Sequence, residues 1–232
     1  MGTFVLIHGA WHGAWCWERL APELEARGHA TIAMDLPVEH GSATFVDYAR
    51  VVIAAAADVE DDVVVVGHSL GSMVVPLVAA ARPTTAMVFL CGIIPNLGGS
   101  PWDDAPPMDE PGTFDGLAAN GDGSMSWSTL AAATHAFYED CTPEDARRAY
   151  ERLRPQNSTS LWGPYPLDAL PAVRRIAIIG ATDRAVTPEF SRAVCPERLG
   201  VDPLELPGGH SPFIARPSDL ADALVATLTT RE

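Results

Sequence analysis

A serine within the sequence Gly-His-Ser-Leu-Gly, at residues 67–71, has the surroundings of a catalytic nucleophile. Four valines at residues 63–66 precede this sequence, and an apolar, alanine-rich stretch follows it to residue 81. The pattern predicts a buried strand, a sharp turn and a helix, with Ser69 at the turn. In a nucleophile elbow of this kind the turn strains the serine backbone, and the two glycines let strand and helix approach closely. We therefore predict that Ser69 is a nucleophile.

A serine hydroxyl is a poor nucleophile at neutral pH, so it needs a base to take its proton and a carboxylate to orient that base. On a parallel sheet these partners lie just after later strands, with the acid before the base. Asp183 follows one predicted strand and His210 follows the next, in the sequence Gly-Gly-His. We therefore expect Ser69, Asp183 and His210 to act together, with Asp168 as the rival for the acid.

Attack of a serine on a carbonyl group also needs donors for the oxyanion that develops. The backbone N–H group of Leu70, the residue after the nucleophile, is one expected donor. The second donor should come from the loop after the first strand, where Ala10 is the best candidate and Gly9 allows a close approach. His8, at the start of this loop, is expected to have a structural role.

The elements that must position these residues alternate along the chain. Apolar runs predict strands at residues 4–7, 30–34, 63–66, 86–90, 175–180 and 204–206. Helical patterns cover residues 14–26, 45–57, 69–81, 188–198 and 218–228, the last with Ser218 as its N-cap. Such alternation predicts an α/β fold, a doubly wound and mostly parallel six-stranded sheet. Its active residues should lie at the carboxyl ends of the strands.

Residues 95–166 have a different composition, rich in Pro, Gly, Asp and Trp. Residues 101–123 are expected to form a loop, helices are expected at 128–138 and 143–153, and no alternating strand pattern is visible. We interpret this segment as a helical lid inserted into a core formed by residues 1–94 and 167–232. Its aromatic residues either pack within the lid or line the substrate pocket, for which the candidates are His12, Trp102, Trp127, Tyr138 and Trp162.

The charge balance favours a neutral small molecule as the partner. The chain has 30 acidic and 15 basic residues, a net charge of −15, and no lysine. This balance argues against binding to nucleic acid or to anionic membrane surfaces. The lysine-free, alanine-rich composition suggests a bacterial source with a GC-rich genome, and a homodimer is a candidate assembly.

The four cysteines are scattered without the close spacing of a zinc site, so we expect free thiols and no metal or cofactor. No basic segment followed by an apolar one marks a secretory signal, and no apolar run approaches the ~20 residues of a membrane helix. A cytoplasmic protein is therefore expected.

Four stretches together carry a family resemblance: residues 4–17, 67–71, 182–190 and 209–213. They resemble the α/β-hydrolases, and more narrowly the branch of plant methylesterases, hydroxynitrile lyases and small bacterial esterases. The resemblance extends from residue 4 to about residue 228. It implies Ser69 as nucleophile, Asp183 as acid, His210 as base, Ala10 and Leu70 as oxyanion donors, and a helical lid.

Two departures from the branch affect the expected reaction. Its hydroxynitrile lyases carry threonine where this chain has Gly9, and lysine where it has Ser211. The missing lysine favours ester hydrolysis over cyanohydrin cleavage. The sequence thus predicts a serine esterase that cleaves a small carboxylic ester through an acyl-enzyme. The alternatives are lyase, thioesterase or cyclisation chemistry on the same scaffold, or a small-molecule receptor without turnover.

Overall fold

A parallel sheet forms the centre of the computed structural model, which describes residues 2–60, 62–97, 107–161 and 163–229. The strand order is β2-β1-β3-β4-β7-β8, and every neighbouring pair is parallel. The bounds are β1 (Thr3–Ile7), β2 (Ala30–Ala33), β3 (Val63–His68), β4 (Ala86–Leu90), β7 (Arg174–Gly180) and β8 (Leu204–Leu206). In the described residues the predicted six-stranded fold class is confirmed.

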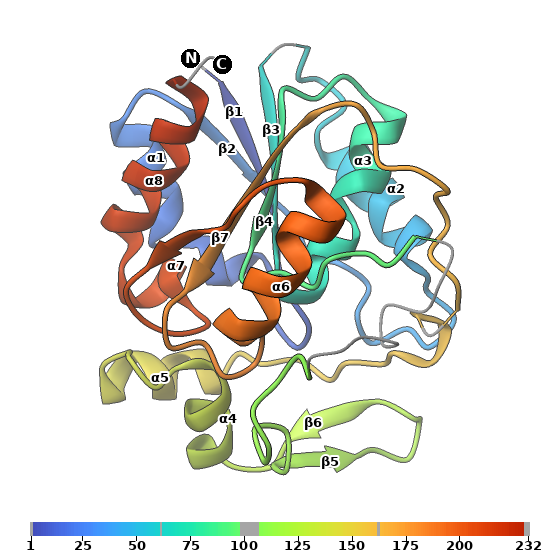
Figure 1. Cartoon of the computed structure of the whole chain (residues 1–232). Coiled ribbons are helices and arrows are strands. Elements are labelled where there is room, and N and C mark those ends of the chain that lie inside the picture. The colour runs from blue at the N-terminus through green and yellow to red at the C-terminus, as the bar shows by residue number, and fades with distance from the viewer. Residues whose placement is uncertain (1, 61, 98–106, 162, 230–232) are drawn as a thin grey trace.

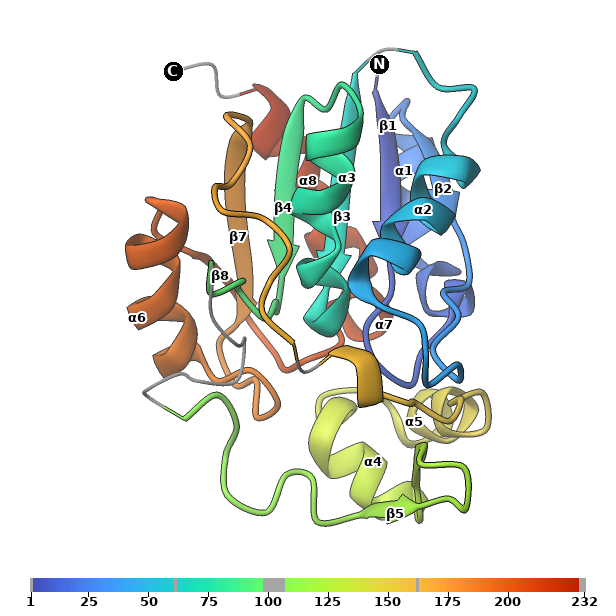
Figure 2. The same ribbon diagram turned by 90° about the vertical axis from the view of Figure 1, so that its right-hand side faces the viewer.

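Neighbouring residues of β3 face opposite sides of the sheet. Val63 and Val65 pack into one cluster of buried side chains, whereas Val64 and Val66 pack into another. The first cluster includes side chains of α2 (Phe45–Ala55), α3 (Val75–Ala81) and α6 (Pro188–Leu199), and the second those of α1 (Leu20–Ala26), α7 (Pro212–Ala215) and α8 (Pro217–Thr229). Figures 1 and 2 show α1 and α8 on one side of the sheet and α2 and α3 on the other. Because both faces are covered, the central strands β3 and β4 are buried along their whole length.

The insertion between β4 and β7 lies across the end of the core to which the strand arrows point (Figure 2). Its described elements are β5 (Leu117–Ala119), β6 (Met125–Trp127), α4 (Leu130–Phe137), α5 (Pro143–Tyr150) and the 3₁₀ helix η3 (Thr159–Leu161). The expectation of no strands here was wrong, because β5 and β6 pair antiparallel. Asp122 orders the turn between them by accepting from the backbone and the hydroxyl of Ser124 at 2.9 and 2.6 Å. Strands of three residues are too short to show a recognisable alternation.

Several element boundaries differ from the sequence prediction, and three helices differ most. The helix expected from residue 69 divides into the 3₁₀ helix η2 (Ser69–Met73) and α3, and the one expected from residue 14 divides into η1 (Ala14–Trp17) and α1. Ser218 is not a cap, since α8 begins at Pro217, and its hydroxyl instead accepts a hydrogen bond from Arg27 at 2.9 Å. None of the described helices is both long and apolar enough to cross a membrane.

Polar contacts attach the insertion to the core. Arg154 forms two 2.7 Å bonds with the carboxylate of Glu39 and donates to the carbonyl oxygen of Leu36 at 3.0 Å. The buried hydroxyl of Tyr165 donates to the carbonyl oxygen of Met73, in η2, at 2.8 Å. These bonds fix the position of the insertion relative to the strand ends.

His8, directly after β1, holds its loop as expected. The backbone N–H group of Leu36 donates to Nε2 at 2.9 Å, so the ring proton is on Nδ1, which donates to the carbonyl oxygen of Gly9 at 2.8 Å. Complete burial lowers the pKa of His8 from 6.5 to about 4. The ring is therefore neutral at neutral pH, and protonation of Nε2 would break the bond to Leu36.

The depressed pKa of His8 predicts acid sensitivity with a definite sign. As the pH falls below 6.5, the unfolded chain binds a proton at His8 that the folded chain does not bind until about pH 4. Its contribution to stability is therefore present above pH 6.5 and decreases on acidification, by about 1.4 kcal/mol per pH unit. Urea unfolding between pH 6.5 and 5 should show a shallower dependence on pH in His8→Gln than in the wild type. Equal slopes would contradict the prediction.

The bond from Tyr165 gives a second test of the fold. Tyr165→Phe leaves the buried carbonyl group of Met73 without this donor, so the free energy of unfolding should fall by about 1–2 kcal/mol. Tyr150→Phe is the matched control, because its hydroxyl makes only a 3.5 Å contact with the Trp127 carbonyl oxygen. It should cost less than about 0.5 kcal/mol in the same denaturation experiment. Equal losses in the two variants would contradict the stabilising role of the Tyr165 hydrogen bond.

Candidate active site

Ser69 occupies a strained turn at the end of β3. Its φ angle is 50°, a conformation that non-glycine residues rarely adopt. The surrounding backbone is packed too closely for other residues. A methyl group at Gly67 would lie 2.6 Å from the carbonyl oxygen of Gly71, and one at Gly71 would lie 2.5 Å from that of His8. The turn therefore has the geometry expected of a nucleophile elbow.

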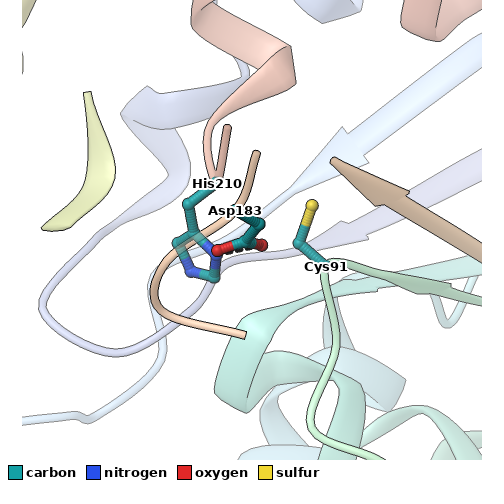
Figure 3. A group of neighbouring side chains, drawn as sticks. All are labelled: Cys91, Asp183 and His210. Atoms are coloured by element: carbon teal, nitrogen blue, oxygen red, sulfur yellow. Dashed lines mark hydrogen bonds and ion pairs between the residues drawn. The ribbon is translucent and has the colours of Figure 1, made fainter. Parts of the chain in front are cut away.

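Asp183 and His210 meet in the loops that follow β7 and β8. His210 Nδ1 lies 2.8 Å from Asp183 Oδ2, and both side chains are almost completely buried (Figure 3). The other carboxylate oxygen accepts from the backbone N–H groups of Ala185 and Val186 at 2.9 and 3.0 Å. The rival acid, Asp168, is solvent-exposed. The structure thus brings Asp183, and not Asp168, to the imidazole.

Cys91, directly after β4, is a third buried group at this position (Figure 3). Its sulfur, a carboxylate oxygen of Asp183 and a ring nitrogen of His210 all lie within 4.8 Å of one another, a grouping that could hold a metal ion. Burial, and then the charge of Asp183, raise the pKa of the Cys91 thiol well above its usual value. Metal binding needs a thiolate, whereas this thiol stays protonated and Asp183 already accepts three hydrogen bonds. These three side chains therefore suit a hydrogen-bonded Asp–His pair better than the binding of a metal cation.

His68 positions the backbone of His210, a function that sequence reasoning did not assign to it. Its Nε2 donates to the carbonyl oxygen of His210 at 2.9 Å, and the two ring centroids are 4.5 Å apart. Burial lowers the pKa of His68 well below its usual value, so the ring is neutral. The available signal was a histidine between the glycine and the serine of the elbow, where a polar side chain has to be buried.

His12 and Tyr138 form a buried pair that connects the loop after β1 to the insertion. His12 Nδ1 donates to the carbonyl oxygen of Ala10 at 2.7 Å, and the hydroxyl of Tyr138, at the end of α4, donates to Nε2 at 2.8 Å. Burial lowers the pKa of His12 to about 3, which keeps the ring neutral. The pair fixes the loop that carries Ala10.

A cavity of about 400 Å³ adjoins Ser69. Ala10 and Leu70, the two expected oxyanion donors, are both part of its wall. The wall is mainly apolar, with contributions from Trp11, Ile93, Met108, Phe114, Met125 and Val186. A methyl group at Gly9 would lie 2.9 Å from the Cβ atom of Ser69, so the loop containing Ala10 packs directly against the serine.

Three of the candidate pocket residues do not line this cavity. His12, Trp127 and Tyr138 are buried and are not among the described residues that line the cavity. Trp127 packs against Phe137, with ring centroids 4.9 Å apart. Trp102 and Trp162 lie outside the described residues. The cavity wall instead contains side chains, Asp109 among them, that sequence reasoning did not select.

Comparison with known proteins supports the family suggested by the sequence. Norfluorocurarine synthase 2 from Strychnos sp is 29% identical over 252 residues, which cover 96% of this chain and 93% of that protein. Methylesterase 7 from Arabidopsis thaliana is 24% identical over 245 residues, covering 96% and 94%. The structure of a pyrethroid hydrolase from Sphingobium faniae JZ-2 matches with a TM-score of 0.84 at 23% identity, covering 97% of this chain and 96% of that one.

The methylesterase among these relatives agrees with the branch that the sequence resemblance implied. A family model described as the alpha/beta hydrolase family matches residues 4–223, nearly the whole chain. This protein therefore belongs to the α/β-hydrolase family.

Proposed function

We propose that this protein is a serine esterase that hydrolyses a small carboxylic ester. The observation that carries the proposal is the buried hydrogen bond of 2.8 Å between Asp183 and His210, in loops at the same end of the sheet as the strained Ser69. Methylesterase 7, at 24% identity, is an esterase by name, which supports ester hydrolysis as the reaction class.

In the proposed reaction His210 Nε2 takes the proton of the Ser69 hydroxyl while the serine oxygen bonds to the ester carbonyl carbon. The backbone N–H groups of Ala10 and Leu70 bind the resulting oxyanion. His210 then gives the proton to the leaving alcohol, and an acyl-enzyme remains. A water molecule, deprotonated by His210, releases the acid and restores Ser69. Asp183 keeps the imidazole oriented and stabilises its positive charge.

We propose that the insertion, residues 95–166, acts as a lid. Met108, Phe114, Leu117 and Met125 from this segment contribute to the cavity wall, which supports the assignment. The lid and the core formed by residues 1–94 and 167–232 then share one substrate site. The bacterial source, the cytoplasmic location and the homodimer are proposals that rest on the sequence alone.

The similarity to norfluorocurarine synthase 2 favours a second candidate, in which the same scaffold performs lyase or cyclisation chemistry. Cyanohydrin cleavage has less support, because Ser211 is completely buried at the position where the related lyases carry lysine. Turnover that persists in Ser69→Ala on the natural substrate would favour a non-covalent reaction over the acyl-enzyme.

A fluorophosphonate, which phosphonylates an activated serine and releases fluoride, tests the nucleophile. Intact-mass measurement should show one adduct on the wild type and none on Ser69→Ala or His210→Ala. Ser158→Ala is the matched control, since Ser158 lines the same cavity, and it should keep the adduct. An adduct that survives in Ser69→Ala, or a folded wild type that does not react, would contradict the proposal.

The choice of acid is tested by a pair of isosteric substitutions. Asp183→Asn should lower kcat by about 10⁴-fold, because a carboxamide no longer holds the imidazole in its reactive tautomer. Asp168→Asn should change kcat less than twofold, since Asp168 is exposed. Steady-state kinetics on an aryl ester, with circular dichroism to verify folding, gives the comparison. A large loss in Asp168→Asn alone would reverse the assignment.

A further inference from the structure

The wall of the cavity beside Ser69 carries one charged side chain among the described residues, Asp109. The polar side chains elsewhere in the described wall, Ser69, Ser158 and Thr159, are uncharged. A carboxylate that faces a mainly apolar cavity is costly unless a partner compensates for its lost hydration. A ligand could supply that partner.

Backbone bonds on both sides hold Asp109 in place. The N–H group of Thr187 donates to the carbonyl oxygen of Met108 at 2.8 Å, and the N–H group of Glu110 donates to that of Arg184 at 2.9 Å. Asp109 therefore lies alongside the loop that follows Asp183, which contributes two further residues to the cavity wall. The backbone at Asp109 is thus held by the same loop that carries the proposed catalytic acid.

The described part of the chain supplies no cation to Asp109. The nearby Arg184 pairs with Glu139 at 2.8 Å and with Glu110 at 3.7 Å. Burial raises the pKa of Asp109, and the opposing influence comes from a backbone N–H group rather than from a basic side chain. Residues 98–106, outside the described part, contain no Arg, Lys or His in the sequence.

Two aromatic side chains, Trp11 and Phe114, line the same cavity, and their ring centroids are 6.1 Å apart. Aromatic groups beside a carboxylate form the kind of environment that recognises a substituted ammonium ion. The net charge of −15 adds a long-range attraction for cations. We propose that Asp109 makes this cavity selective for esters that carry a cationic ammonium group next to an apolar or aromatic body.

This inference rests on the proposed function, because it names the substrate class of the same site. An ammonium group would pair with Asp109 while the apolar body occupies the remainder of the cavity. An ester with an anionic group would be repelled at the same point. Asp109 would then determine which esters bind without taking part in bond breaking.

The test uses two molecules of nearly equal shape that differ in charge, phenyltrimethylammonium and tert-butylbenzene. Each is measured as a competitive inhibitor of phenyl acetate hydrolysis by the wild type, Asp109→Asn and Glu110→Gln. The inhibition constant of the ammonium ion should rise about tenfold in Asp109→Asn, which corresponds to about 1.4 kcal/mol, and that of tert-butylbenzene should not change. Glu110→Gln is the matched control, since it removes a neighbouring charge outside this cavity, and it should change both constants less than twofold.

An unchanged inhibition constant for the ammonium ion in Asp109→Asn would overturn the proposal. An equal rise in Glu110→Gln would also overturn it, because the effect would then come from the general charge of the protein. If the wild type does not hydrolyse phenyl acetate, the esterase proposal fails on this ester. The role of Asp109 is then decided by calorimetry, which measures the binding of the same two molecules to the wild type and to Asp109→Asn.

Discussion

The close approach of backbone segments at the end of β3 is the constraint on which the rest of the site depends. Side chains at Gly9, Gly67 or Gly71 would meet neighbouring atoms at distances below 3 Å. Because glycine has no side chain at these three positions, the loop after β1 and the first turn of η2 can lie directly against β3. The positive φ angle of Ser69 follows from the same packing. Without it, the serine would not lie beside the cavity with Ala10 and Leu70.

Three neutral, buried histidines connect the loops around this point. His8 donates to Gly9, His12 to Ala10 and His68 to His210, in each case from a ring nitrogen to a backbone carbonyl oxygen. A neutral imidazole can donate with one nitrogen and accept with the other. His8 and His12 use both ring nitrogens. His8 therefore joins the loop after β1 to Leu36, and His12 joins the same loop to Tyr138. A buried charge on any of these rings would be costly, which is why burial lowers all three pKa values.

The sheet could be predicted from the sequence because its signals are local. The valines before Ser69 alternate between two cores, and each of the six apolar runs that predict a strand is a strand in the structure. The elbow was predictable for the same reason, since its glycines are adjacent in sequence to the strand. The rule that the acid precedes the base, each just after a strand, also sufficed to predict that Asp183 and His210 act as a pair, and the structure joins them by a hydrogen bond.

The cavity could not be predicted in this way, because its wall is made by long-range contacts. The sequence left open whether the aromatic residues of the insertion pack within it or line the pocket, and Trp127 and Tyr138 are buried in packing and hydrogen bonding. Asp109 reaches the cavity only because backbone bonds hold its segment against the loop after β7. Neither composition nor periodicity carries that information.

The bond between Tyr138 and His12 limits how independently the two parts of this molecule can evolve or be redesigned. An enzyme of this family could be given a new substrate range by exchanging its insertion for that of a relative. Here the exchange would also remove Tyr138, the hydrogen-bond partner of His12. It would remove Arg154 as well, which donates to the carbonyl oxygen of Leu36. The core would then lose support for the backbone that carries Ala10. Substrate range and the rigidity of the reaction centre are thus coupled traits, and single substitutions in the cavity wall are the safer route to altered selectivity.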